Sequence, residues 1–327
     1  MATATGDILR LVRKGIDVRA VTAHTRKPFR LYLCGDPALV ASMRALLLSG
    51  HDDSVPPDAA ACLETIVPGM AQVTLTREAR AVLFLGRPGD AGSADFAPLR
   101  ALNVPIFAIT IDERAQPSGP SGPPAAGEYA EYVVTALSKE ALRGRVFPHL
   151  VERCKGVEIA LGRRLPVLRE TVAAKLTRDA AGNALKVALA SAVVDHIPVF
   201  GLVLGAFASA GDMVAITGIQ MMLLLHIEAA YGRDPDVQRL WQLLPVVGGG
   251  FGWRMLAREL SGFIPVAGIA IKGAIAYAGT IVVGEGVTFY YEHGKHMSAG
   301  QATSIYENTK KDALEFARDL IGRLKKR

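Results

Sequence analysis

Two long apolar runs constrain this chain more than any other feature of its sequence. They occupy residues 197–225 and 263–283, and each contains one charged side chain, Asp212 in the first and Lys272 in the second. A helix needs about 20 predominantly apolar residues to cross a hydrocarbon layer of ~30 Å. The runs therefore predict membrane-inserting helices. Two similar buried helices of a soluble bundle are the alternative.

The two runs resemble internal copies of one segment. Ile197-Pro-Val-Phe-Gly201 corresponds to Ile264-Pro-Val-Ala-Gly268, and small and aliphatic residues follow in both. Repeated apolar segments that are interrupted by Gly and Pro indicate paired helical hairpins or broken helices. The apolar stretch between them, residues 243–253, is too short and too rich in glycine to span, so we expect a turn or a re-entrant connector.

Three ionisable residues within or beside the apolar runs are candidates for a polar site in the membrane half: Asp212, Lys272 and Glu285. A charge in hydrocarbon is costly unless it is paired or hydrated, so such residues often mark a functional site. The alternative is a position at the headgroup level. Because of Asp212 and Lys272, a channel-like or transporter-like function is an alternative for the membrane half.

The first half of the chain has the pattern of an α/β domain. A strand is expected at residues 29–35, followed by a turn and a helix at 36–50. The further strand-like runs are Gln72–Leu75, Ala81–Leu85, Val104–Ile111 and Tyr132–Thr135. Strands that alternate with helical stretches predict a mainly parallel sheet.

The strand signals stop near residue 138, and the rest of the chain is expected to be helical. Ser138 is a candidate N-cap for a helix that continues to about Lys155, and Pro166 suits the first turn of the next helix. Before this point, residues 113–128 are rich in Pro, Gly and Ser and are expected to form a mobile loop.

A partial phosphate-binding motif follows the first expected strand. The pattern GxxxxGK[ST] needs two glycines for a tight backbone turn, Lys for the phosphates and Ser or Thr for magnesium. Gly35 and Ser42 stand at matching positions, but Val40 and Ala41 replace the second glycine and the lysine. The motif therefore lacks its main point charge.

Two later segments extend the comparison. Ile109-Thr110-Ile111-Asp112 keeps the aspartate that reads guanine in a GTPase, and Thr135-Ala136-Leu137 stands where a second guanine-contacting loop would lie. No DxxG precedes Ala81. In order and spacing, residues 28–150 resemble a degenerate small GTPase of the Era/TrmE-like type, a P-loop α/β fold.

This resemblance implies a remnant nucleotide pocket at Gly35, Ser42 and Asp112 and no catalytic residue. No cofactor is expected. GTP with magnesium is the alternative, and it would require Arg44 or Arg30 to take the place of the missing lysine.

A second resemblance covers residues 155–294. The segments ALGRRLPVLRETVAAKLTRDAAGNALKVALASAVVDHIP (160–198) and GGGFGWRMLARELSGFIPVAGIAIKGAIAYAGTIVVGEG (248–286) are similar to the YcjF-like membrane-associated domain of unknown function. This resemblance implies a helical module linked to the bacterial inner membrane, often found beside GTPase domains. It implies no established reaction.

Basic segments at both ends complete the predicted domain organisation. It comprises a basic amphipathic helix at 1–27, the GTPase-like α/β domain at 28–150, the helical membrane-associated domain at 151–297 and a basic amphipathic helix at 298–327. The capping-box pattern Ser304-Ile-Tyr-Glu307 is expected to begin the last helix. Basic ends suit an anionic cytoplasmic leaflet, and nucleic acid is not expected because aromatic residues do not interleave with the basic ones.

The cysteines and histidines give weaker signals. Cys34, Cys62 and Cys154 form no CxxC pattern, which fits a reducing compartment, and Cys34 is expected to be a buried, inert thiol. His293 and His296 lack a third clustered ligand, so no metal site is predicted.

The preferred function is a non-enzymatic adaptor at the cytoplasmic face of the inner membrane, with both termini in the cytoplasm. The expected partners are membrane lipid and another protein, for which a true GTPase and a second copy of this chain are candidates. Four arginines in the 228–262 connection favour two shallow hairpins over two spans: Arg233, Arg239, Arg254 and Arg258. A working GTPase switch is the alternative from another class.

Overall fold

The computed structural model describes residues 18–50, 54–67, 74–90, 97–194, 201–236, 238 and 268–324. The chain divides into two compact units. The α/β unit comprises Thr22–Lys175 and Ala229–Asp234, and the helical unit comprises Met1–Val21, Leu176–Glu228 and Pro235–Arg327. The α/β unit therefore extends beyond residue 150, where its boundary was expected, and takes in a short segment from much later in the chain.

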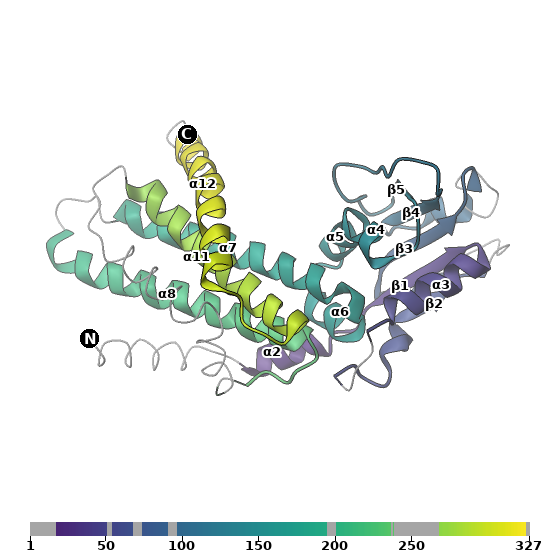
Figure 1. Ribbon diagram of the computed structural model, residues 1–327, viewed down its shortest axis with the longest axis horizontal. Coiled ribbons are helices and arrows are strands. Elements are labelled where there is room, and N and C mark those ends of the chain that lie inside the picture. The colour runs from purple at the N-terminus through teal and green to yellow at the C-terminus, as the bar shows by residue number, and fades with distance from the viewer. Residues whose placement is uncertain are drawn as a thin grey trace. The chain divides into compact units, whose positions relative to one another are not determined.

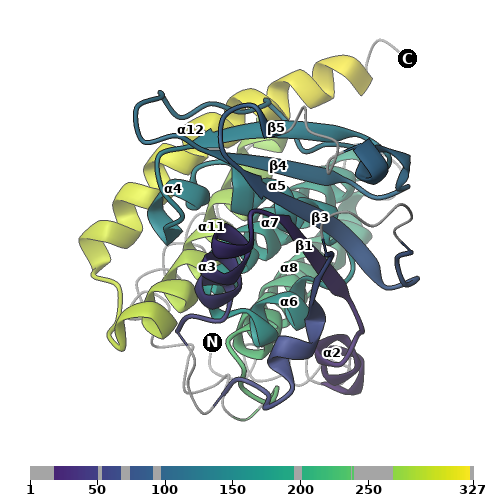
Figure 2. The same ribbon diagram turned by 90° about the vertical axis from the view of Figure 1, so that its right-hand side faces the viewer.

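The α/β unit is built on a five-stranded sheet in the order β2-β1-β3-β4-β5, and every adjacent pair is parallel (Figures 1 and 2). The strands are β1 (Arg30–Gly35), β2 (Leu63–Thr65), β3 (Ala79–Gly86), β4 (Ile106–Ile111) and β5 (Tyr129–Val134). The expectation of an α/β fold with a mainly parallel sheet is confirmed. This order is that of a doubly wound sheet whose connections change direction between β1 and β3.

The central strands are buried on both faces, as the strands of a parallel sheet commonly are. On one face, Tyr32, Cys34, Val82 and Phe84 pack with Leu99 of η3 (Ala97–Ala101). The opposite face includes Leu31, Leu33, Leu83 and Phe107, each at most 1% exposed. Successive side chains alternate between the two faces because a β-strand has a two-residue period, so burial is continuous along these strands.

The other elements of this unit are α2 (Val18–Thr25), whose first residues fall in the helical unit, α3 (Pro37–Leu47), η1 (Ala59–Cys62), α4 (Lys139–Arg143), α5 (Val146–Arg153), α6 (Glu158–Arg164) and η4 (Pro166–Leu168). Ser138 caps α4 as expected, because its side chain accepts a hydrogen bond from the Ala141 amide at 3.2 Å. The single helix expected to reach Lys155 is instead two helices, since α4 ends at Arg143 beside Gly144.

One expected strand is replaced by another. Leu75 lies outside any strand, and residues 72–73 lie outside the described part of the chain. The sheet edge is formed instead by β2, whose residues Leu63 and Thr65 pair with Leu31 and Leu33 of β1. The strand β2 was not predicted because it has three residues and the polar Glu64 stands at its centre, so it lacks an alternating apolar pattern.

The helical unit contains four long helices within the described residues: α7 (Arg169–Val194), α8 (Gly201–Ala230), α11 (Gly268–His293) and α12 (Ala299–Leu324). The first residues of α7 and the last two of α8 belong to the α/β unit. The helices α8 and α11 are continuous, so the described part of neither apolar run contains the hairpin turn that was expected. Residues 195–200, 239–267 and the connector expected at 243–253 lie outside the described residues.

Small residues bring α7 and α11 close together. A Cβ atom added to Gly284 would lie 2.1 Å from the Thr177 Oγ1 atom, and one added to Gly273 would lie 2.6 Å from Leu185 Cδ1. The pairing of later residues of α7 with earlier residues of α11 shows that the two helices are antiparallel. A cluster of small and aliphatic side chains from α7, α8 and α11 continues this contact: Ala184, Ala188, Ile216 and Ala276.

The last helix lies within the range expected for it, 298–327, but a different capping box begins it. Ser298 and Gln301 form the capping box of α12: the Ser298 amide donates to Gln301 Oε1 at 3.1 Å, and the Gln301 amide donates to Ser298 Oγ at 3.3 Å. Ser304 lies inside the helix and is not its first residue, so the start predicted there is wrong. Capping-box patterns therefore begin at both Ser298 and Ser304, six residues apart, and the one at Ser298 forms.

One helix among the described residues, Ala270–His293, has the length and composition needed to cross a membrane, and 72% of its most apolar window is buried within the protein. The helix α8 runs from Gly201 to Ala230, and its side chains are described from Ala215 on, a part that alone is shorter than a span. The described residues therefore contain one candidate for the two expected spans, and a buried core helix satisfies the same criteria.

Candidate functional site

The change of direction between β1 and β3 is the place where a doubly wound sheet binds its ligands, outside the carboxyl ends of the strands. The last residue of β1, Gly35, has a φ of +106°, and a Cβ atom there would lie 2.0 Å from the Leu85 carbonyl oxygen. The Asp36 amide donates to that same oxygen at 2.9 Å. Only glycine can therefore make this turn beside β3.

The chain enters α3 directly after Gly35, without the extended loop that cradles phosphates. Pro37 has no amide hydrogen, and the amides of Ala38 and Leu39 both donate to Asp36 Oδ1, at 2.9 and 3.0 Å. The Val40 amide donates to the Asp36 carbonyl oxygen at 2.9 Å. The amides that make a helix N-terminus attractive to an anion are thus already bonded within the protein.

The end of β3 is closed in the same manner. The Arg87 amide donates to Asp90 Oδ2 at 2.7 Å, and the Asp90 amide donates to the Arg87 carbonyl oxygen at 3.1 Å. A Cβ atom added to Gly86 would lie 2.8 Å from the Asp90 Cβ atom, so the turn folds tightly against the strand end. Asp90 was not among the expected site residues, although the run Gly86-Arg-Pro-Gly-Asp90 has the composition of a turn.

Asp112, the expected guanine-reading residue, follows β4. Its carboxylate accepts a hydrogen bond from the Arg114 amide at 3.0 Å, and its own amide donates to the Val134 carbonyl oxygen at 2.9 Å. The ends of β1 and β4 are two strands apart, which is roughly 10 Å at the usual strand spacing. Gly35 and Asp112 therefore lie at the same sheet edge, and the segment 135–137 follows β5 at that edge.

The three strand ends share one arrangement. Asp36 after β1, Asp90 after β3 and Asp112 after β4 each direct a carboxylate onto backbone amides of its own turn. A carboxylate at each position supplies the negative charge that a bound phosphate would supply, and it repels an incoming anion. We call these three side chains the aspartate edge.

Ser42 and the two arginines considered as substitutes for lysine are engaged elsewhere. Ser42 is exposed on α3 and donates from Oγ to the Ala38 carbonyl oxygen at 2.9 Å. Arg44 donates to the carbonyl oxygens of Leu63, at 2.8 Å, and of Ala60, at 3.4 Å. Neither side chain is directed to the turn after Gly35.

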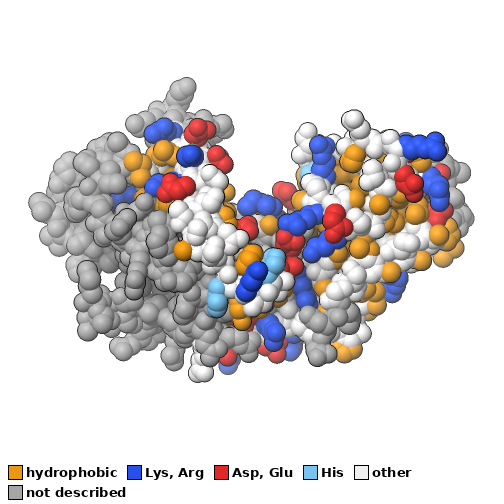
Figure 3. All heavy atoms as spheres, viewed as in Figure 1, with side chains coloured by type: hydrophobic (Ala, Val, Ile, Leu, Met, Phe, Trp, Pro, Cys, Tyr) orange, Lys and Arg blue, Asp and Glu red, His pale blue; other side chains and the backbone are white. Residues whose placement is uncertain are grey.

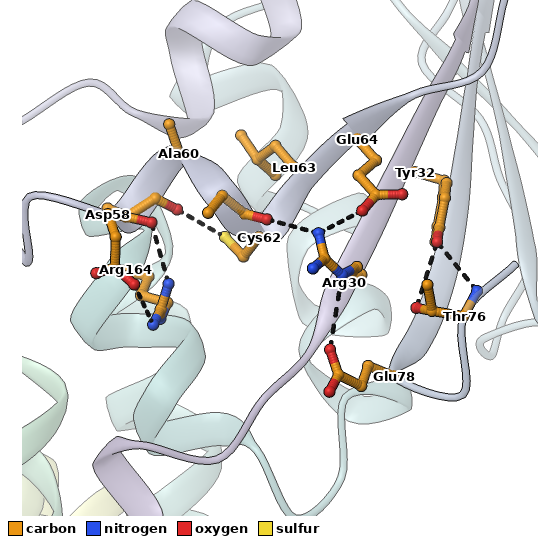
Figure 4. A network of polar contacts seen from close by, with 12 residues as sticks. Arg30, Tyr32, Asp58, Ala60, Cys62, Leu63, Glu64, Thr76, Glu78 and Arg164 are labelled. Carbon is orange, nitrogen blue, oxygen red and sulfur yellow. Dashed lines mark hydrogen bonds and ion pairs between the residues drawn. The ribbon is translucent and has the colours of Figure 1, made fainter.

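Arg30 is the first residue of β1 and lies at the amino ends of the strands, in the network that Figure 4 shows. It forms ion pairs with Glu64 and Glu78 and donates to the Ala61 carbonyl oxygen at 3.0 Å. Five residues of extended strand, roughly 17 Å, separate it from Gly35. Arg30 therefore does not replace the missing lysine in this arrangement.

The three ionisable residues expected in the membrane half do not form one described cluster. Lys272 and Glu285 are half-buried and stand 13 positions apart on α11, which is about 20 Å along a helix. Asp212 belongs to α8, and its side chain lies outside what the structure describes.

The histidines and cysteines have local roles. His293 stacks on Phe289 with ring centroids 4.2 Å apart, and His296 stacks on Tyr290 at 5.7 Å. The three cysteines, Cys34, Cys62 and Cys154, are free and buried, and burial raises the pKa of each thiol to about 12. The expectation that Cys34 is a buried thiol is confirmed.

Charges of both signs are interspersed on the described part of the face drawn in Figure 3. The α/β unit contains ion pairs at its surface, including Arg163 with Asp234 at 3.1 Å and Arg164 with Asp58 at 3.0 Å. Exposed pairs of this kind contribute between about 0 and 1 kcal/mol each. On this face the net positive charge is therefore not gathered into the single-sign stripe that nucleic-acid binders carry.

Comparison of the chain with protein-family models, with curated proteins and with solved structures found no match to any of them. What can be stated of its class therefore comes from its own architecture. The chain joins an α/β unit with a parallel sheet, whose strands β1, β3 and β4 are each followed by a turn closed by its own aspartate, to a unit of long apolar helices.

Proposed function

We propose that the protein is a non-catalytic adaptor at the cytoplasmic face of a membrane. The α/β unit serves as a protein-docking module, and the helical unit associates it with lipid. The proposal draws on the resemblance of the first half of the chain to a degenerate GTPase and of the second half to a YcjF-like domain. A true GTPase is the protein partner that these resemblances favour.

The aspartate edge is the observation that carries the proposal. Phosphoryl transfer is catalysed almost entirely by positioning and by stabilising negative charge on phosphate oxygens. Here the amides at the start of α3 are bonded to Asp36, the lysine position holds Ala41, and Ser42 bonds to its own helix. These features favour a scaffold over a nucleotide-driven enzyme.

The membrane part of the proposal has its own support. The helix α11 is long and apolar enough to span. Tyr290 and Tyr291 lie at its carboxyl end, followed by Lys295 and His296, and all four are partly or fully exposed. Tyrosines and basic residues commonly anchor a helix end at the level of the lipid headgroups.

A nucleotide titration tests the first part. A fluorescent GTP analogue is added with magnesium to the full chain in mild detergent, with an active small GTPase as the positive control. We expect millimolar affinity or weaker and no GTP hydrolysis. Submicromolar binding, or hydrolysis that disappears in a Ser42→Ala variant, would contradict the proposal. Hydrolysis that survives Ser42→Ala would indicate a contaminating enzyme.

Extraction and labelling test the second part. We expect the full chain to sediment with membranes after washing with high salt and then alkaline carbonate, because salt screens only surface charge. Release by carbonate would replace the integral assignment with a soluble helical unit. Both termini are proposed to face the cytoplasm. A cysteine placed at position 327, in a variant whose three native cysteines are replaced, should therefore escape an impermeant reagent added outside intact cells.

A further inference from the structure

The segment 114–124 contains four side chains at intervals of three residues: Arg114, Pro117, Pro120 and Pro123. A polyproline II helix has three residues per turn, so residues at this interval share one edge. Proline fixes its own φ near −65° and directs the residue before it to extended conformations. The sequence therefore favours an extended segment. In the structure Arg114 lies in a turn, because the Ala115 amide donates to the Asp112 carbonyl oxygen at 3.3 Å, and the extended part follows this turn.

The structure holds this segment in place through its backbone. Ser118 forms an antiparallel bridge with Val133 at the outer edge of β5, with N···O distances of 3.1 and 2.9 Å. Gly119 packs closely against the Tyr132 ring, because a Cβ atom added to Gly119 would lie 2.9 Å from Tyr132 Cδ1. The loop that was expected to be mobile is therefore attached to the sheet.

The helix α5 and its N-cap supply a second line of attachment. Arg145, His149 and Arg153 follow one another at four-residue intervals, so they share a face. Arg145 donates to the Gly119 carbonyl oxygen and Arg153 to the Pro123 carbonyl oxygen, both at 2.6 Å. Between them, the Tyr132 hydroxyl bonds to His149 Nδ1 at 2.9 Å.

These attachments use main-chain atoms and leave the recognition side chains outside. Arg114 and Pro117 are exposed, and Pro120 is partly exposed. An extended segment that is already held in one conformation loses less entropy when it binds, which increases its affinity.

We infer that residues 116–120 are a docking segment for a partner domain with an aromatic-lined groove of the SH3 type. Such grooves bind PxxP segments in the polyproline II conformation. Pro117 and Pro120 fill the aromatic pockets, and the exposed Arg114 stands in the turn that precedes them. This inference rests on the proposed adaptor function and names the chemistry of its partner.

A binding experiment with purified components tests the inference. The full chain in detergent is titrated against a panel of purified SH3-type domains that bind PxxP segments. We expect saturable binding by at least one domain, weakened at least tenfold in a Pro117→Ala/Pro120→Ala variant. Pro88→Ala, at an exposed turn outside the segment, is the matched control and should leave the affinity unchanged.

A second variant tests whether the attachment of the segment to α5 contributes to binding in addition to its sequence. Arg145→Ala/Arg153→Ala keeps residues 116–120 intact but removes both carbonyl contacts, and we expect it to bind several-fold more weakly than the unaltered chain. Absence of binding across the panel, or binding that Pro117→Ala/Pro120→Ala does not change, would overturn the inference. The GTP titration reports on the adaptor proposal separately, because Arg114, Pro117 and Pro120 play no part in it.

Discussion

Asp36 closes the first turn of α3 with a single oxygen atom, which accepts hydrogen bonds from two amides. Replacing it with alanine leaves those amides without a protein acceptor. We expect Asp36→Ala to lower the free energy of unfolding by about 1 kcal/mol, the usual effect of losing an N-cap. Asp36→Ser retains a capping oxygen and should be close to the native chain. Chemical denaturation of the full chain measures the difference, and equal losses in the two variants would contradict the capping role.

Gly35 and Gly89 both have positive φ values, +106° and +98°, but their surroundings differ. A Cβ atom at Gly35 would overlap the Leu85 carbonyl oxygen, whereas one at Gly89 would meet nothing within 4 Å. We expect Gly89→Ala to cost about 1 kcal/mol through backbone strain alone. Gly35→Ala should cost several times more or prevent folding. Similar thermal midpoints for the two variants would show that the close approach at β3 is relaxed.

His149 gives the α/β unit a dependence on pH. Burial is the main factor that lowers its pKa below 6.5; Arg145 and Arg153 act in the same direction, and Glu152 opposes them. The Tyr132 hydroxyl, whose pKa burial raises to about 12, stays protonated in this pH range and is hydrogen-bonded to His149 Nδ1. The unfolded chain then binds a proton more readily than the folded chain does, so this stability is complete above pH 6.5 and is lost as pH falls below it.

A His149→Gln variant should therefore show a smaller fall in thermal midpoint between pH 7 and pH 5 than the unaltered chain. His24, whose pKa burial also lowers, contributes to the same window. His24→Gln serves as the companion variant, and the two effects should add. An unchanged pH profile in His149→Gln would mean that protonation of His149 does not oppose folding.

At the scale of secondary-structure elements, the sequence was most informative where a pattern was long. The runs that became β3 and β4 were recognised because consecutive buried residues leave a strong apolar signal. The strand β2 was not, because it has three residues and Glu64 interrupts it. The expected start of α12 failed for a different reason: Ser298 and Ser304 both begin acceptable capping boxes, and local sequence does not rank them.

The candidate site was predicted in part. Gly35 and Asp112 do lie at one sheet edge, because parallel strands bring their carboxyl ends together. The role of Asp36 was missed because the comparison with a phosphate-binding loop assumed a loop where the chain already forms a helix. The attachment of residues 113–128 could not be foreseen, since Arg145 and Arg153 lie about 30 residues further along the chain.

The contact between α7 and α11 depends on Gly284. Its replacement by alanine places a methyl group against Thr177, and we expect a loss of about 1–3 kcal/mol through overpacking. Gly218→Ala on α8 meets nothing within 4 Å and should be neutral or stabilising, because alanine favours a helix. Helix content on heating, followed by circular dichroism, distinguishes the variants. Equal melting curves would show that α7 and α11 do not depend on this close approach.

At the scale of the whole molecule, the α/β unit is discontinuous in sequence. Tyr231, from the late segment Ala229–Asp234, is 6% exposed and lies beneath Arg169, whose guanidinium carbon is 5.8 Å from the ring centroid. A Cβ atom added to Gly162 would lie 3.1 Å from Ala230 Cβ, and Arg163 pairs with Asp234. This segment is therefore part of the core of the α/β unit.

Tyr231→Ala should accordingly destabilise the α/β unit by about 3 kcal/mol or more, as large-to-small changes of buried aromatic residues do. Tyr129 is 47% exposed, and Tyr129→Ala should cost no more than about 1 kcal/mol, the contribution of its contact with Arg100. Proteolysis of the full chain under native conditions, with cleavage mapped to residues 22–175, reports on this unit. Equal protection of both variants would show that the late segment is dispensable.

The late segment also sets the order of events on the ribosome. An N-terminal domain ordinarily folds as soon as its own residues have emerged, but the α/β unit cannot be completed until Asp234 has been made. The intervening stretch of about 60 residues takes roughly 3 to 12 s to synthesise at 5–20 residues per second. During that interval the nascent unit lacks Tyr231. Completion of the α/β unit therefore waits until the helix α7 and the first apolar run have been synthesised.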